Sequence, residues 1–137
     1  MRRTRLSLSE YTRAVNAGWP DDDIGRAIIH DLPRRFHALS PGAQKRVLSE
    51  APPLTYTRWD ALLAATAEHI ARLHGHPVPD WVDEAPRFLD PPWVLSDVRR
   101  IRIDSILHAP AAFIRHGALP DPKDLDARGG EKHEWLP

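Results

Sequence analysis

Histidine and carboxylate side chains are the groups in this sequence that suit metal binding or acid–base chemistry. The closest histidine pair is His74 and His76, on either side of Gly75. Two imidazoles share a metal ion only if the chain between them folds toward one point, and no second pair stands at metal-ligand spacing. Surface or helix-capping roles are therefore favoured, and the sequence predicts neither a metal ion nor another cofactor.

Sequence motifs of catalysis are missing. Glu68-His69 resembles part of the helical zinc-protease motif, but the histidines that this motif requires on both sides are absent. Asp80, Asp83 and Glu84 are candidates for paired acids, although this spacing is more typical of a solvated surface near a helix start. There is no cysteine, which excludes thiol nucleophiles and thiolate zinc sites. We expect the chain not to be an enzyme, and a small hydrolase or metal enzyme is the last-ranked hypothesis.

Arginines form two groups that could contact phosphates. They are Arg2, Arg3 and Arg5 in a basic arm, and Arg99, Arg100 and Arg102 further along the chain. Asp97 and Asp104 flank the second group, and 19 Lys and Arg balance 19 Asp and Glu overall, so no general field attracts nucleic acid. A solvated or partner-facing helix is the favoured interpretation, and a DNA-binding transcriptional regulator remains the alternative function.

Aromatic residues point to protein binding. Trp81, Phe88 and Trp93 lie in and just after a proline-rich segment, and Trp135 stands almost alone in a polar tail. Tryptophan is enriched at interface hot spots because it buries a large area with few rotatable bonds. For the first three, a role in the chain's own core is equally expected. Trp135 is predicted to dock, either on this domain or on a partner.

The elements that position these side chains are predicted to be helices. Ser7 and Glu10 form a capping box for a helix over 8–17, and Thr57 and Asp60 have the same spacing before a central helix that ends at Gly75. Pro33 is predicted to end or kink the second helix. A helix over 96–107 contains several β-branched residues, so a strand remains possible there. A last short helix begins at 109 and stops at Gly117.

The central helix is the predicted core. Its large apolar residues recur at helical spacing and are interleaved with alanines that allow close packing; they are Trp59, Leu62, Leu63, Thr66, Ile70 and Leu73. The fold class is therefore all-α, a compact multi-helix bundle with a proline-rich irregular segment and an extended C-terminal tail. We predict a flexible basic arm over 1–5, a single helical domain over 6–119 and an extended polar tail over 120–137.

The sequence indicates a soluble, cytoplasmic protein. No segment approaches the roughly 20 consecutive apolar residues that span a bilayer. The basic start is followed by polar residues and Glu10 instead of the apolar stretch of a signal peptide. The absence of cysteine fits a reducing compartment.

A family resemblance makes the functional expectation more specific. It is carried by residues 58–63 (RWDALL), 67–70 (AEHI), 79–81 (PDW), 87–93 (RFLDPPW), 109–117 (APAAFIRHG) and 121–126 (DPKDLD). These stretches, spread over roughly residues 40–128, resemble a domain of small actinobacterial antitoxins that are encoded beside nucleotidyltransferase-like toxins. Some members carry an additional helix-turn-helix domain ahead of this region, and the first forty residues here do not form one.

The resemblance implies a bacterial toxin–antitoxin system in which this chain binds and neutralises its toxin in a hetero-oligomer. Neither a membrane nor a small-molecule substrate is expected. Affinity would come from a few aromatic and arginine anchors. The predicted partner-binding residues are Trp81, Phe88, Trp93, Phe113, Arg115 and Trp135. The acidic tail is expected to enter a basic groove that serves nucleic acid or phosphate.

Overall fold

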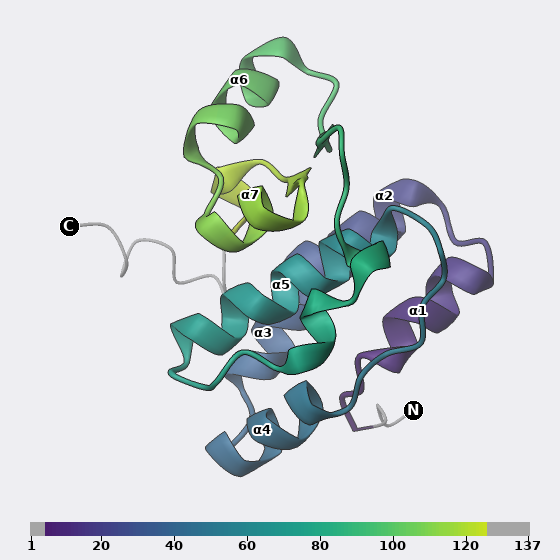
Figure 1. Ribbon diagram of the computed structural model, residues 1–137, viewed down its shortest axis with the longest axis vertical. Coiled ribbons are helices and arrows are strands. Elements are labelled where there is room, and N and C mark those ends of the chain that lie inside the picture. Colours follow the sequence, from purple (N-terminus) through teal and green to yellow (C-terminus); the bar gives the residue numbers. More distant parts are fainter. Residues whose placement is uncertain (1–4, 126–137) are drawn as a thin grey trace.

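The computed structural model describes residues 5–125, and helices dominate this part of the chain (Figure 1). The all-α prediction is confirmed. The helices are α1 Ser9–Asn16, α2 Asp21–Arg26, η1 Ala27–Asp31, α3 Leu32–His37, α4 Pro41–Ser49, α5 Trp59–Leu73, η2 Asp80–Asp83, η3 Ala85–Arg87, α6 Arg99–His108, α7 Ala111–His116 and α8 Pro122–Leu125. Two short strands, β1 Trp93–Val94 and β2 Ala118–Leu119, pair in parallel.

Helix α5 is the centre of the core, as predicted. Its side chains from Trp59 to Ala71 are buried except His69, which is half-buried. Figure 1 shows α5 between the N-terminal helices and α7. The alanines allow this close packing because their short side chains let neighbouring backbones approach. Leu73 differs from the prediction: it is 46% exposed, whereas Ile70 and Ala71 in the same turn are buried.

Side chains cap the two helices for which capping boxes are predicted. The Glu10 carboxylate accepts the Ser7 backbone N–H at 3.2 Å, and the Ser7 hydroxyl accepts the Ser9 N–H. Before α5, the buried Asp60 carboxylate accepts the backbone N–H groups of Thr55 and Tyr56, two residues and one residue earlier than the Thr57 N–H that a standard capping box would use. Both contacts satisfy backbone donors that would otherwise lack partners.

Pro33 does not end the second helix. The turn η1 is a π-helix, in which the Leu32 N–H bonds to the Ala27 carbonyl five residues earlier. Pro33 follows directly, at the start of α3. The wider turn admits the proline ring and its missing N–H without a break, so α2, η1 and α3 form one continuous rod.

The C-terminal part is held by the strand pair and a glycine. Trp93 aligns with Ala118 and Val94 with Leu119, so α6 and α7 form the crossover between the strands. Gly117 ends α7 in the left-handed region (φ 74°), and a Cβ atom there would clash with the Leu89 carbonyl oxygen. Helix α6 is helical as predicted, and the strand alternative is excluded. It lies at the opposite end of the molecule from α4 (Figure 1).

Residues 120–125 differ from the predicted extended tail. Pro120 is buried, and α8 packs against η1. The predicted arm over residues 1–4 and the tail from residue 126 onward, including Trp135, lie outside the described residues. Within the described range, no helix combines the length and the apolar character that crossing a membrane requires.

Candidate protein-interaction surface

Exposed aliphatic side chains gather on α6 and α7. Within the described part of the chain, five of the eight large hydrophobic residues that are well exposed fall between residues 98 and 114. They are Val98, Ile103, Ile106, Leu107 and Ile114. Single exposed hydrophobic residues are ordinary, but a group on adjoining elements marks an interaction site.

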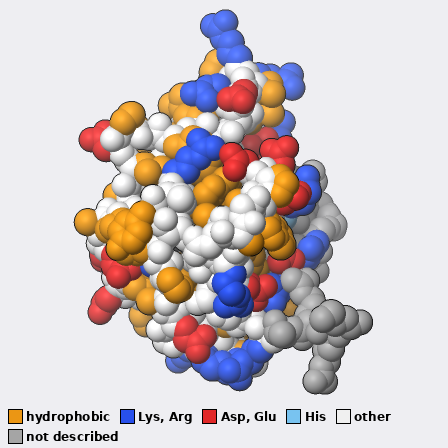
Figure 2. Space-filling view, turned by 90° about the vertical axis from the view of Figure 1, so that its right-hand side faces the viewer, with side chains coloured by type: hydrophobic (Ala, Val, Ile, Leu, Met, Phe, Trp, Pro, Cys, Tyr) orange, Lys and Arg blue, Asp and Glu red, His pale blue; other side chains and the backbone are white. Residues whose placement is uncertain are grey.

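One side of α6 carries both the apolar residues and two arginines. Ile103, Ile106 and Leu107 are spaced by one helical turn, and Arg99 and Arg100 stand one turn before Ile103. The exposed fractions of Ile106 and Leu107 are 57% and 66%. We call these five residues the α6 face. Figure 2 shows hydrophobic side chains beside Lys and Arg side chains at the end of the molecule where α6 lies.

The opposite side of α6 is fixed to the protein. Arg102 donates to the carbonyl oxygens of Val94 at 3.3 Å and Ser96 at 2.9 Å, and Ser105 is fully buried. Arg102 is half-buried, so only Arg99 and Arg100 of the predicted basic group are exposed. These contacts fix the position of α6, and its apolar side faces solvent.

A buried polar cluster attaches α7 to α5 beneath this surface. Glu68 of α5 is 1% exposed, and its carboxylate accepts hydrogen bonds from Arg115 and contacts His116, which is fully buried. Arg115 also pairs with Asp83 at 2.8 Å. Burial alone would raise the pKa of Glu68, but the hydrogen bonds and charges of Arg115 and His116 outweigh it and hold this pKa below its usual value.

His116 makes a polar contact at each of its two ring nitrogens. Its Nδ1 lies 2.7 Å from the Arg87 carbonyl oxygen, which only accepts, so Nδ1 carries a hydrogen. Its Nε2 lies 2.9 Å from Glu68 Oε1. A hydrogen bond there needs a proton on one of the two atoms. The pair thus joins α5, α7 and η3 through groups that solvent does not reach.

Two of the predicted anchors lie in the protein's own core. Trp81 is 8% exposed and donates its indole N–H to the Leu48 carbonyl at 2.8 Å. Phe113 is completely buried. Phe113 has no exposed surface and Trp81 has little, so both side chains pack inside the protein in this structure.

The other described anchors are partly accessible. Phe88 stacks on His116 with ring centroids 4.5 Å apart, and the Arg115 guanidinium lies over the same Phe88 ring. Arg115 is 41% exposed although its charge is paired. Trp93 is half-buried and contacts Trp59 edge to face. The structure therefore brings Phe88 and Arg115 together and leaves Trp93 in a separate place, beside α5.

Side chains of the last-ranked enzyme hypothesis make structural contacts. Glu84 pairs with the buried Arg87 at 2.8 Å, and His76 contacts Gln44 at 2.7 Å. No group of three or more potential metal-binding side chains occurs among residues 5–125.

Sequence reasoning did not identify the most exposed residues of α6 or the buried Glu68. The apolar type and helical spacing of Ile103 and Leu107 favour buried positions, because such residues are normally buried, but the structure exposes both. The signal for Glu68 was its position: it is a charged residue on the alanine-rich stretch of the core helix, and a buried charge requires a partner.

Comparison with known proteins finds no match: no protein-family model, curated protein or solved structure is similar to the chain.

Proposed function

We propose that this chain is an antitoxin that binds a nucleotidyltransferase-type toxin directly and neutralises it. The observation that supports protein binding best is the α6 face, where three well-exposed aliphatic residues adjoin two arginines. The identity of the partner as such a toxin rests on the sequence resemblance. The protein acts by covering the toxin's nucleotide or substrate site, or by holding the toxin in an inactive conformation.

The exposed apolar side chains of α6 are the main anchors of the proposed interface. Ile103, Ile106 and Leu107 provide the buried centre of the interface, where desolvation gives most of the affinity. Arg99 and Arg100 at its edge favour an acidic region of the toxin. Arg115 and Phe88 remain accessible contributors, whereas Trp81 and Phe113 are buried in the core.

The test is expression of the neighbouring gene's product with and without this chain. We expect that product to stop growth when expressed alone, growth to be restored by co-expression, and the two proteins to co-purify at moderate salt. A toxic neighbour that is neither bound nor neutralised would contradict the proposal.

DNA binding is the second candidate, supported by the exposed pair Arg99 and Arg100. Two arginines neutralise few phosphates, so affinity would be weak and would depend only modestly on salt. Binding of a DNA duplex that is lost on replacing both arginines by alanine, together with no protein partner, would favour this function.

A further inference from the structure

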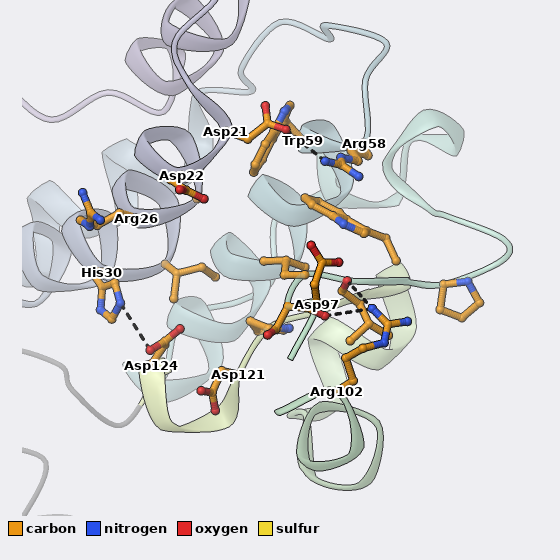
Figure 3. A pocket seen from close by; sticks show the side chains of 18 residues that line it. Asp21, Asp22, Arg26, His30, Arg58, Trp59, Asp97, Arg102, Asp121 and Asp124 are labelled. Carbon is orange, nitrogen blue, oxygen red and sulfur yellow. Dashed lines mark hydrogen bonds and ion pairs between the residues drawn. The ribbon is translucent and has the colours of Figure 1, made fainter. Parts of the chain in front are cut away.

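A cavity of about 750 Å³ opens between the N-terminal helices and the segment that leads into α6. Its walls come from α2, η1, the start of α5, the β1–α6 connection and the segment before α8. Figure 3 shows Asp21 and Asp22 on one side and Asp97 and Arg102 on the other. This volume lies within the range of about 300–1,000 Å³ that is typical of ligand sites.

Two tryptophans form an aromatic corner in this cavity. Trp59 and Trp93 meet at 90° with ring centroids 5.0 Å apart. The Arg58 guanidinium lies over the Trp93 ring, 4.1 Å from its centroid, and pairs with Asp21 at 3.2 Å. Arg58 therefore shows which kind of group fits this corner, namely a planar cation between an indole face and a carboxylate.

Carboxylates exceed guanidinium groups around the cavity. Three arginines line it, and all three are already used: Arg26 pairs with Asp23, Arg58 pairs with Asp21, and Arg102 donates to backbone carbonyls. The lining carboxylates are Asp21, Asp22, Asp97, Asp121 and Asp124. The side chains of Asp22 and Asp97 are exposed and form no ion pair with a lining arginine. These two carboxylates carry negative charge that no lining arginine neutralises, so they can attract a cation that enters the cavity.

Asp124 also lies where negative charge is in excess. Its carboxylate lies 3.7 Å from His30 Nε2. Burial raises the pKa of Asp124 and the neighbouring Asp121 carboxylate raises it further, while His30 acts in the opposite direction. Negative charge is therefore costly here, and a bound cation would stabilise it.

We propose that this cavity binds the guanidinium group of an arginine in a segment of a partner protein. A partner guanidinium that replaces Arg58 over the Trp93 ring would stack in the same way, and the carboxylates on opposite sides suit its several N–H donors. The volume admits the residues next to that arginine. The inference deepens the proposed function because the partner would be the bound toxin, which would then contact both this cavity and the α6 face.

The test uses a short capped peptide with one central arginine, and follows the indole N–H signals of Trp59 and Trp93 by NMR. We expect saturable shifts of these signals. The same peptide with citrulline, which keeps the shape and lacks the charge, should not shift them. Equal shifts with citrulline, or no saturable shift with arginine, would overturn the proposal.

Two further ligands test which cation the cavity prefers and whether that cation must belong to a protein segment. A lysine peptide that binds as well as the arginine peptide would contradict the guanidinium assignment. Free arginine amide that binds as tightly as the peptide would contradict a protein segment as the source.

Matched variants locate the binding site. Combining Asp22→Asn with Asp97→Asn should weaken arginine-peptide binding about fivefold or more, because two exposed charge contacts are lost. Asp80→Asn, an exposed carboxylate outside the cavity, should leave it unchanged. Equal affinity of the double variant and the unmodified protein would overturn the site.

The α6 face distinguishes this inference from the proposed function. A variant with Ile106→Asp and Leu107→Asp should bind the arginine peptide normally. If the unmodified protein binds the peptide but not the toxin, the proposed function fails alone. If toxin binds but the peptide does not, the cavity inference fails alone.

Discussion

Glu68 is the residue on which the attachment of α7 depends most. It is 1% exposed and contacts both Arg115 and His116. Buried charges are costly unless each is paired, and removing one partner leaves the others desolvated without compensation. The cluster therefore makes the position of α7 sensitive to a single carboxylate.

We predict that Glu68→Gln lowers the free energy of unfolding by about 3 kcal/mol at pH 7. The pKa of Glu68 in the folded protein lies below its ordinary value of 4.5, because the Arg115 and His116 contacts outweigh burial. Its contribution is thus complete above pH 4.5 and is lost as the pH falls through the folded-state pKa. The difference between variant and unmodified protein should narrow below pH 4.5 in urea unfolding experiments.

Glu50→Gln is the control, since Glu50 is exposed at the end of α4. We expect a change within about 0.5 kcal/mol at every pH. A Glu68 variant whose deficit stays constant down to pH 3 would contradict the assigned role of the ionised carboxylate.

Residue types and their spacing predicted the helix caps well. They predicted contacts between residues far apart in the sequence poorly. Ser7 and Glu10 are three positions apart, so their contact was predictable from local spacing. The Glu68–His116 contact joins residues 48 positions apart, and only the packing of α5 on α7 brings them together. Asp60 lies between these cases: its capping role was expected, while its burial was not.

Among the elements, the turn at Gly117 fixes the path from α7 into β2. The Leu89 N–H bonds to the His116 carbonyl, and the Trp93 N–H bonds to the Gly117 carbonyl at 2.8 Å. The backbone of Leu89 therefore passes directly against the glycine. A side chain at this position meets both an unfavourable φ angle and that backbone.

Gly117→Ala should lower the free energy of unfolding by at least about 2 kcal/mol, because the left-handed conformation alone costs roughly 1–2 kcal/mol. Gly42→Ala is a matched control: this glycine lies in α4 with open space around it, and alanine there should stabilise by up to about 1 kcal/mol. Thermal unfolding of both variants checks this. An unchanged melting temperature for Gly117→Ala would contradict the close approach of Leu89.

Helix types and positions were largely predictable from capping, glycine stops and apolar spacing. The exceptions have local causes. The π-turn at η1 lets the chain continue through Pro33, and no pattern in the sequence marks such a turn. On α6 Ile103, Ile106 and Leu107 follow one side of the helix, but their spacing alone could not indicate that this side faces solvent.

At the scale of the whole molecule, the two candidate binding features lie close together. The cavity includes residues 93–97 and Arg102, which lead into and begin α6, while the α6 face lies on the exposed side of the same helix. We expect a partner large enough to cover α6 to extend to the cavity as well. The size of such an interface, and not any single residue, would give the affinity that neutralising a toxin requires.

The arrangement of these features was beyond sequence reasoning. The cavity needs α2, the start of α5 and the β1–α6 connection to converge, although they are about 35 residues apart in each step along the chain. The aromatic anchors were chosen by residue type, which cannot distinguish Phe113 in the core from Trp93 at the cavity. Apolar exposure, which identifies the α6 face, becomes visible only in the folded protein.

The central claim is that the α6 face binds the toxin, and binding by the combined variant Ile106→Asp and Leu107→Asp tests it most directly. Buried aspartates at the centre of an interface should weaken toxin binding at least about 100-fold, measured by calorimetry. Leu73→Asp, with a comparable exposed fraction on α5, should change binding less than about threefold, and circular dichroism should show all these proteins folded. Unchanged toxin affinity in the folded α6 variant would contradict the account.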